Sequence, residues 1–267
     1  MSLLLPIYAF AIGAIVGSFL NVVIHRYPRE ESIVFPPSRC PRCGTAIKPY
    51  DNIPIISYAL LGGRCRSCHT PISMRYPLVE LANGLFYLAI FQRTGVSIAF
   101  IPIAAIVSMF IVLIYIDAEI QILPDMIDLP GIAIGIAIGA LGLDQLTPGL
   151  VLAHSLTDSL LGAAIGAGVL LTIALAYKLL RHIEGMGLGD VKMLAMIGAV
   201  MGAEALLPVL LIASVSGALC AIPLALRHDK GMQLAIPFGV FLGFGALVVL
   251  FFGGTLWASW LNVFGVR

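Results

Sequence analysis

Long apolar runs separated by short polar stretches make up most of this chain. A membrane-spanning helix needs about 20 mostly apolar residues. The run that begins at Val191 is too long for one span, and Glu204 and Pro208 interrupt it, so we divide it near Gly202. The pattern predicts an all-α polytopic membrane protein with about eight transmembrane helices. The expected spans are residues 3–23, 77–91, 97–116, 129–142, 159–180, 191–202, 202–226 and 236–253.

The composition supports this class and excludes others. Hydrophobic residues make up 60% of the chain and charged residues 11%, whereas a soluble domain carries roughly 25% charged residues. So little charge cannot cover a water-soluble fold, which excludes a soluble enzyme and a disordered protein. The net charge of +1 gives no general attraction to a polyanion. We therefore expect a lipid bilayer as the surroundings and no nucleic acid as a partner.

The basic residues predict how the chain is oriented. With eight spans, every Lys and Arg except Arg93 and Arg267 falls on one side of the membrane. Because cytoplasmic loops carry an excess of these residues, the polar segment 24–76 is expected in the cytoplasm, and both termini outside. No basic residue precedes the first apolar run, which favours an uncleaved helix over a secretory signal peptide.

Four of the five cysteines form two Cys-x-x-Cys pairs in this polar segment. They are Cys40 with Cys43, and Cys65 with Cys68. Two such pairs can surround one zinc ion tetrahedrally, and disulfides are disfavoured in the cytoplasm. The segment also has too few apolar residues for a core of its own, so a structural metal would stabilise it. The alternatives are paired disulfides or redox-active thiols.

Carboxylates cluster at the cytoplasmic ends of two predicted spans. Asp117 and Asp125 follow the third span, and Asp190 begins the sixth. Two facing carboxylates can share one proton, so that one acts as a base and the other as an acid in hydrolysis. Gly187 and Gly189 would allow a peptide backbone to approach Asp190. These residues alone leave open whether Asp117 or Asp125 is the partner of Asp190.

Plainer interpretations compete with this one. Glu119 and Asp128 are expected to be loop solubilisers or helix caps, and Asp125 is equally well explained as a cap. Lys192 either extends to the lipid headgroups or adds positive potential beside the acids. The small residues spaced four apart indicate close packing within the chain, although a homodimer face is possible. They are Gly13/Gly17, Gly131/Gly135/Gly139, Gly162/Gly166, Gly198/Gly202 and Gly239/Gly243.

Six motifs, in order along the chain, carry a family resemblance. They are residues 17–26, the two Cys pairs, 75–81, 116–125, 185–194 and 236–239. On these motifs the whole chain resembles the type IV prepilin peptidases, which are bifunctional leader peptidases and N-methyltransferases of pilus and type II secretion systems. A Gly-x-Gly-Asp sequence alone would be weak, but six ordered motifs on a matching hydropathy profile are specific.

The resemblance implies an aspartic endopeptidase of the inner membrane that acts at the cytoplasmic face. Its catalytic residues would be Asp117 and Asp190. The implied substrates are prepilins and pseudopilins, whose new N-terminal residue is then methylated with S-adenosylmethionine. Residues 1–23 would form the first helix, 24–76 a methyltransferase-associated zinc-knuckle loop, and 77–267 the peptidase core. No chemical pattern in the sequence identifies the residues that bind the methyl donor.

Three other functions remain as alternatives. An ion-coupled transporter could use the acidic residues, but these cluster at one face, and no inverted repeat is visible. A peptidase that has lost methylation and a non-enzymatic zinc scaffold are the other two. Cleavage of a prepilin with and without S-adenosylmethionine separates all of them.

Overall fold

The computed structural model describes residues 4–182, 187–227 and 236–263, without the side chains of 224–227 and 256–263. Gly185 of the glycine motif, and Lys230 and Arg267 of the charge analysis, lie outside these ranges. The described residues form helices and two isolated β-bridges, and no strands. The chain divides into two compact units, Met1–Val96 and Ser97–Arg267.

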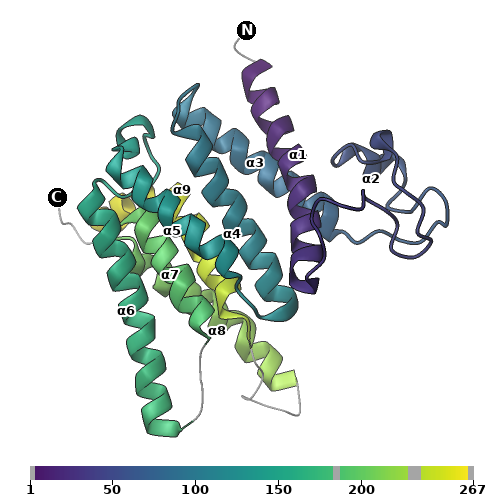
Figure 1. The fold of residues 1–267 in the computed structure, drawn as a ribbon. Helices are drawn as coiled ribbons and strands as arrows, with labels where there is room; N and C mark the ends of the chain where they lie inside the picture. The colour runs from purple at the N-terminus through teal and green to yellow at the C-terminus, as the bar shows by residue number, and fades with distance from the viewer. Residues whose placement is uncertain (1–3, 183–186, 228–235, 264–267) are drawn as a thin grey trace. The chain divides into compact units, whose positions relative to one another are not determined.

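The first unit is a helix pair that carries the polar segment. Helices α1 (Leu4–Arg26) and α3 (Arg75–Thr94) pack against each other (Figure 1). Gly13 and Gly17 allow this packing, since a Cβ at Gly13 would lie 2.7 Å from Tyr87 Cβ and one at Gly17 would lie 2.8 Å from Glu80 Cα. Three short helices interrupt the connecting segment: η1 (Tyr27–Arg29), η2 (Pro49–Asp51) and α2 (Ile56–Leu60).

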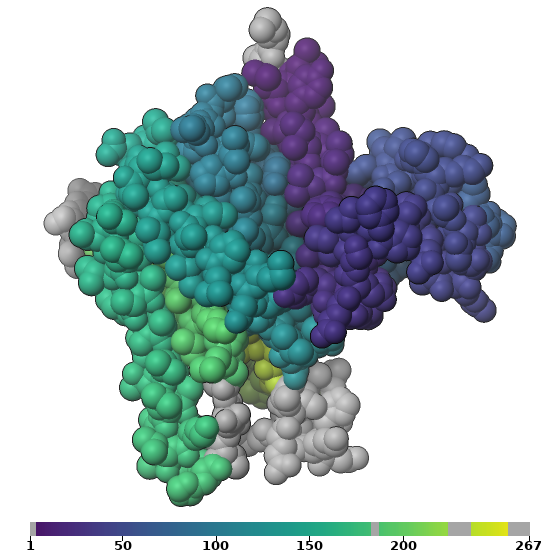
Figure 2. Space-filling view, in the orientation of Figure 1, coloured from purple at the N-terminus to yellow at the C-terminus, as the bar shows by residue number. Residues whose placement is uncertain are grey.

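The second unit is a helical bundle built around one short helix. Helix α7 (Leu188–Met201) contacts α5, α6, α8 and α9, and every residue from Met193 to Met201 is buried. By contrast, the last turns of α6 lie exposed at the surface of the bundle (Figure 2). The other helices of this unit are α4 (Phe100–Ile120), α5 (Asp125–Ala140), α6 (Leu156–Arg181), α8 (Leu206–Arg227) and α9 (Phe238–Val263), with η3 (Leu143–Leu146) after α5.

Glycines on facing helices hold this bundle together. A Cβ at Gly162 of α6 would lie 2.1 Å from Gly198 O of α7, and one at Gly166 would lie 2.5 Å from Leu194 O. On the other side of α7, a Cβ at Gly135 of α5 would lie 2.8 Å from Ala199 C. Because backbones this close leave no room for a side chain, the predicted packing role of the small residues is confirmed.

The helical, multi-pass prediction is confirmed, although fewer helices than expected meet the criteria for a span. Among the described residues, five segments are long and apolar enough to cross a membrane: Leu4–Arg29, Phe100–Ile120, Leu156–Arg181, Leu206–Pro223 and Phe238–Thr255. The three other predicted spans correspond to α3, α5 and α7. Helices α5 and α7 are short, with 16 and 14 residues.

Candidate active site and metal cluster

Asp117 lies near the end of α4, against the first turn of α9. Its side chain is almost fully buried, and Oδ2 accepts a hydrogen bond of 2.9 Å from Val240 N–H. Val240 is the third residue of α9, so its N–H has no acceptor within that helix. The positive end of the helix also favours a carboxylate. The first turn of α9 therefore holds Asp117 in one position.

Leu123 connects this turn to the start of α7. A Cβ at Gly239 would lie 2.9 Å from Asp117 Oδ2 and 3.0 Å from Leu123 Cδ1. A Cβ at Gly189 would lie 2.8 Å from Leu123 Cβ. The first turns of α7 and α9 thus approach the connection between α4 and α5 because both carry a glycine there.

Gly187 has a different environment. It caps α7 with φ −73° and ψ 148°, which any residue can adopt, and a Cβ there would meet only Gly189 N, at 3.9 Å. Packing within the described chain therefore gives no reason for glycine at this position.

Asp190 is the third residue of α7 and is partly buried. The contacts through Leu123 place the start of α7, which carries Asp190, beside the turn that holds Asp117. The structure therefore brings together, in the second unit, two carboxylates that are 73 positions apart in the sequence.

Lys192 has a partner that the sequence did not indicate. Its Nζ donates a hydrogen bond of 2.6 Å to Asp125 Oδ1 and so connects the start of α7 to the start of α5. Asp128, one turn further along α5, is fully buried, and neither of its carboxylate oxygens has a hydrogen-bond partner among the described residues. The charges of Asp125, Lys192 and Asp190 all act on it. The interpretation of Asp128 as a loop solubiliser or cap is therefore wrong.

The four cysteines of the polar segment converge as predicted. Their sulfur atoms all lie within 4.8 Å of one another, and Cys40 Sγ is 3.8 Å from Cys68 Sγ. Zinc–sulfur bonds of about 2.3 Å in a tetrahedron place the sulfurs about 3.8 Å apart. All four thiols are free. The donor set and its spacing therefore fit a metal ion, and no disulfide joins the pairs.

The two cysteine pairs belong to a repeated structural unit that the sequence analysis did not recognise. Residues 38–47 and 63–72 share the pattern Arg-Cys-x-x-Cys-x-Thr-x-Ile. In each copy the N–H of the first cysteine donates to the threonine carbonyl, with both distances 2.9 Å: Cys40 to Thr45, and Cys65 to Thr70. Each copy also has one isolated β-bridge. The repeat is visible in the sequence, because the two matching segments lie 25 residues apart.

Hydroxyl groups near the sulfurs favour the thiolate form. Thr70 Oγ1 lies 3.3 Å from Cys68 Sγ, and this hydrogen bond is the main reason that the pKa of Cys68 is lowered to about 6. Thr45 is placed in the same way beside Cys43 and lowers the pKa of that thiol. Because metals bind the thiolate, the second cysteine of each copy is suited to bind a cation.

Comparisons with known proteins agree with this two-part construction. The model for the bacterial peptidase A24 N-terminal domain matches residues 11–94, and that for the type IV leader peptidase family matches residues 104–222. The multi-pass helical fold and these two matches define a polytopic membrane peptidase. The chain belongs to the type IV leader peptidase family.

Relatives in several bacteria cover most of the chain. A protein of Burkholderia pseudomallei strain 1026b is 36% identical, over 92% of this chain and 85% of its own length. One from Pseudomonas putida is 34% identical, over 96% and 94%. One from Myxococcus xanthus is 41% identical over 85% of this chain, which spans 65% of that relative. All three are described as prepilin leader peptidase/N-methyltransferase. No solved structure matches the chain.

Proposed function

We propose that Asp117 and Asp190 are the catalytic pair of this aspartic endopeptidase. The enzyme cleaves the leader from prepilins and then methylates the new N-terminus, as the names of its relatives state for them. The proposal extends the substrates to type II secretion pseudopilins. The observation that supports the catalytic pair is the position of Asp117, which the first turn of α9 holds beside the start of α7, where Asp190 lies.

The two carboxylates can hydrolyse a peptide bond without a covalent intermediate. One draws a proton from a water molecule, whose oxygen attacks the scissile carbonyl, while the other protonates the carbonyl oxygen. The carbon–nitrogen bond then breaks, and the leaving amine takes a proton. Val240 N–H holds one oxygen of Asp117 during this exchange, so the carboxylate keeps its orientation.

Substituting each aspartate tests this assignment. Asp117→Asn and Asp190→Asn should each abolish leader cleavage, because each removes one half of a pair that acts as a unit. Glu119→Gln is the matched control, since this exposed acid lies two residues beyond Asp117 on the same helix. Methylation of a peptide that lacks the leader should persist in all three variants. Normal cleavage by either aspartate variant would refute the pair.

We further propose that Cys40, Cys43, Cys65 and Cys68 bind one structural zinc ion. The purified protein should contain about one zinc per chain by elemental analysis. Cys65→Ser should lower this content and impair methylation more than cleavage, because the catalytic acids lie in the other unit. Cys220→Ser, at an exposed cysteine outside the cluster, is the control. A protein that contains no zinc, with wild-type methylation in Cys65→Ser, would exclude the site.

The topology and the division of labour complete the proposal. The enzyme crosses the inner membrane eight times, with α3, α5 and α7 as the additional spans, and presents the acids at the cytoplasmic face. Segment 24–76 serves methylation and residues 77–267 serve cleavage. The distribution of Lys and Arg supports this orientation. Reporter fusions after residues 60 and 148 should be located on opposite sides of the membrane.

The small residues pack within the units, so we propose no dimer.

S-adenosylmethionine is the proposed methyl donor. It supplies a methyl group on a sulfonium sulfur; the nitrogen lone pair of the pilin amine takes this group, the carbon–sulfur electrons return to sulfur, and the amine proton passes to water.

A further inference from the structure

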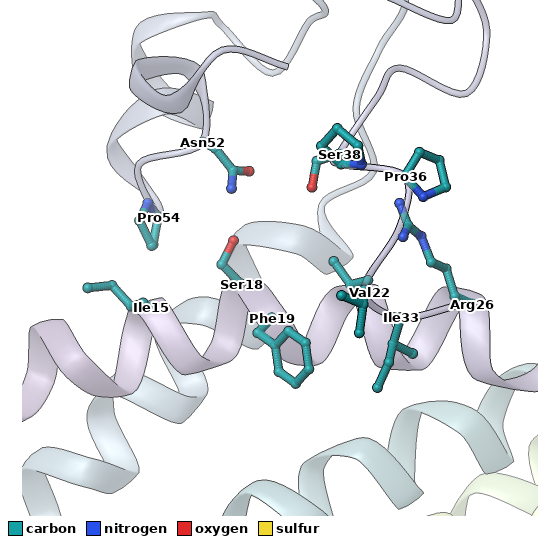
Figure 3. A pocket seen from close by; sticks show the side chains of 12 residues that line it. Ile15, Ser18, Phe19, Val22, Arg26, Ile33, Pro36, Ser38, Asn52 and Pro54 are labelled. Carbon is teal, nitrogen blue, oxygen red and sulfur yellow. The ribbon is translucent and has the colours of Figure 1, made fainter. Parts of the chain in front are cut away.

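We propose that a cavity of about 290 Å³ in the first unit binds S-adenosylmethionine. The cavity lies between the second half of α1 and two stretches of the polar segment. Figure 3 shows Ser18 and Arg26 extending from α1 toward the loops that carry Ser38 and Asn52. This inference rests on the methyltransferase activity stated above, since that activity requires a site for the donor.

The lining suits an organic ligand of moderate size. Ligand pockets are mostly apolar and carry a few polar groups that fix orientation, and their volumes begin at about 300 Å³. Four polar residues and eight apolar ones surround this cavity. The apolar residues are Ile15, Phe19, Val22, Ile33, Val34, Pro36, Pro37 and Pro54.

Arg26 determines the charge of the ligand group at one end. It is the one charged side chain that lines the cavity, and a guanidinium group is suited to hold a carboxylate through two hydrogen bonds. The amino-acid part of S-adenosylmethionine carries such a carboxylate. A pilin N-terminus offers no carboxylate for Arg26 to hold, so this end of the cavity is better matched to the donor than to the pilin amine.

The opposite end of the cavity has a different polarity. Ser18 lies eight residues before Arg26 on α1, about 12 Å away along the helix. The cavity therefore has a positive end, an apolar middle and an uncharged polar end. This arrangement suits S-adenosylmethionine, whose carboxylate and uncharged adenine ring lie at opposite ends, whereas a phospholipid would need one polar end only.

The loop beside the cavity is held in a strained conformation. Ile55, next to the lining residue Pro54, has φ 63° and ψ −50°, a region that β-branched residues rarely occupy. Its N–H donates a hydrogen bond of 2.7 Å to Glu80 Oε2, which fixes the turn against α3. Strained backbone of this kind is found at ligand sites, where the surrounding structure maintains it.

Equilibrium binding of tritiated S-adenosylmethionine to the full-length protein in detergent micelles tests the proposal. Arg26→Gln should raise the dissociation constant at least tenfold, because a charge-assisted contact is lost. Arg26 also donates to Ser32 O, so a second variant, Val22→Phe, fills the cavity and leaves that hydrogen bond intact. Arg29→Gln, on the next turn and outside the lining, is the matched control. Prepilin leader cleavage should be unchanged in all three.

The outcomes separate this inference from the proposed function. If the unaltered chain methylates but both variants bind the donor with wild-type affinity, the cavity is not the site. If both variants lose affinity for phosphatidylglycerol but keep wild-type affinity for S-adenosylmethionine, a lipid occupies the cavity, and the inference also fails. If the unaltered chain neither binds the donor nor methylates, the methyltransferase function itself is refuted. A tenfold loss of donor affinity in both variants, with normal affinity in Arg29→Gln, supports the inference.

Discussion

A single methyl group at Gly239 should slow leader cleavage without unfolding the protein. A Cβ at this position would lie 2.9 Å from Asp117 Oδ2, and ordinary contact begins at 3.4 Å, so the carboxylate has to move by about half an ångström. That movement lengthens the hydrogen bond from Val240. Displacements of 0.5–1 Å in a catalytic group cost roughly ten- to a hundredfold in rate. We expect kcat/KM for prepilin cleavage to fall by that factor in Gly239→Ala.

The control for this experiment lies on the same helix. A Cβ at Gly254 would meet nothing within 4 Å, so Gly254→Ala should cleave at the wild-type rate. Both substitutions raise helix propensity by up to about 1 kcal/mol, so a loss of activity cannot come from a weakened helix. Methylation of a peptide without leader should be normal in both variants. Wild-type cleavage by Gly239→Ala, or an equal loss in both variants, would refute the positioning of Asp117 by α9.

Three further substitutions test neighbouring features. His69→Gly should stabilise the second cysteine unit by about 1 kcal/mol, because His69 has φ 54°; zinc extraction by a chelator should slow, and faster extraction would contradict this. Lys192→Met should change cleavage by less than about fivefold, since its pairing with Asp125 is partly exposed; a larger loss would mean that Lys192 acts on the catalytic acids directly. Asp128→Asn should retain leader cleavage in a kinetic assay, because Asp128 makes no hydrogen bond among the described residues; an inactive, folded variant would make it a third essential acid.

The sequence predicted local features well because local patterns determine them. The apolar runs indicated the long helices, and the Cys-x-x-Cys spacing indicated the sulfur cluster. Helix α5 begins at Asp125 and not near residue 129, and α7 begins at Leu188 and not at 191. Both differences have one reason: a charged residue can occupy a first helical turn, whereas the predicted apolar run starts only after the last acidic residue, Asp128 or Asp190.

Contacts between distant segments could not be predicted in this way. Asp117 accepts a hydrogen bond from Val240, which is 123 positions away in the sequence, and Lys192 donates one to Asp125, 67 positions away. The hydrophobic periodicity of the sequence cannot indicate such pairs, because each pair depends on how whole helices pack. The burial of Asp128 was missed for the same reason: its neighbours in the sequence look like a loop, while its neighbours in space enclose it.

In the eight-span topology proposed above, α5 crosses the membrane, and its short length bears on how water reaches the proposed catalytic acids. Its 16 residues extend about 24 Å, against a hydrocarbon core of about 30 Å. Met126 and Leu129 are exposed on its first turns, and a short helix that faces lipid thins the bilayer around it. Hydrophobic mismatch would thus lower the headgroups and their water toward the acids at the start of α5 and α7. Cleavage should accordingly slow as the lipid acyl chains of a reconstituted bilayer are lengthened.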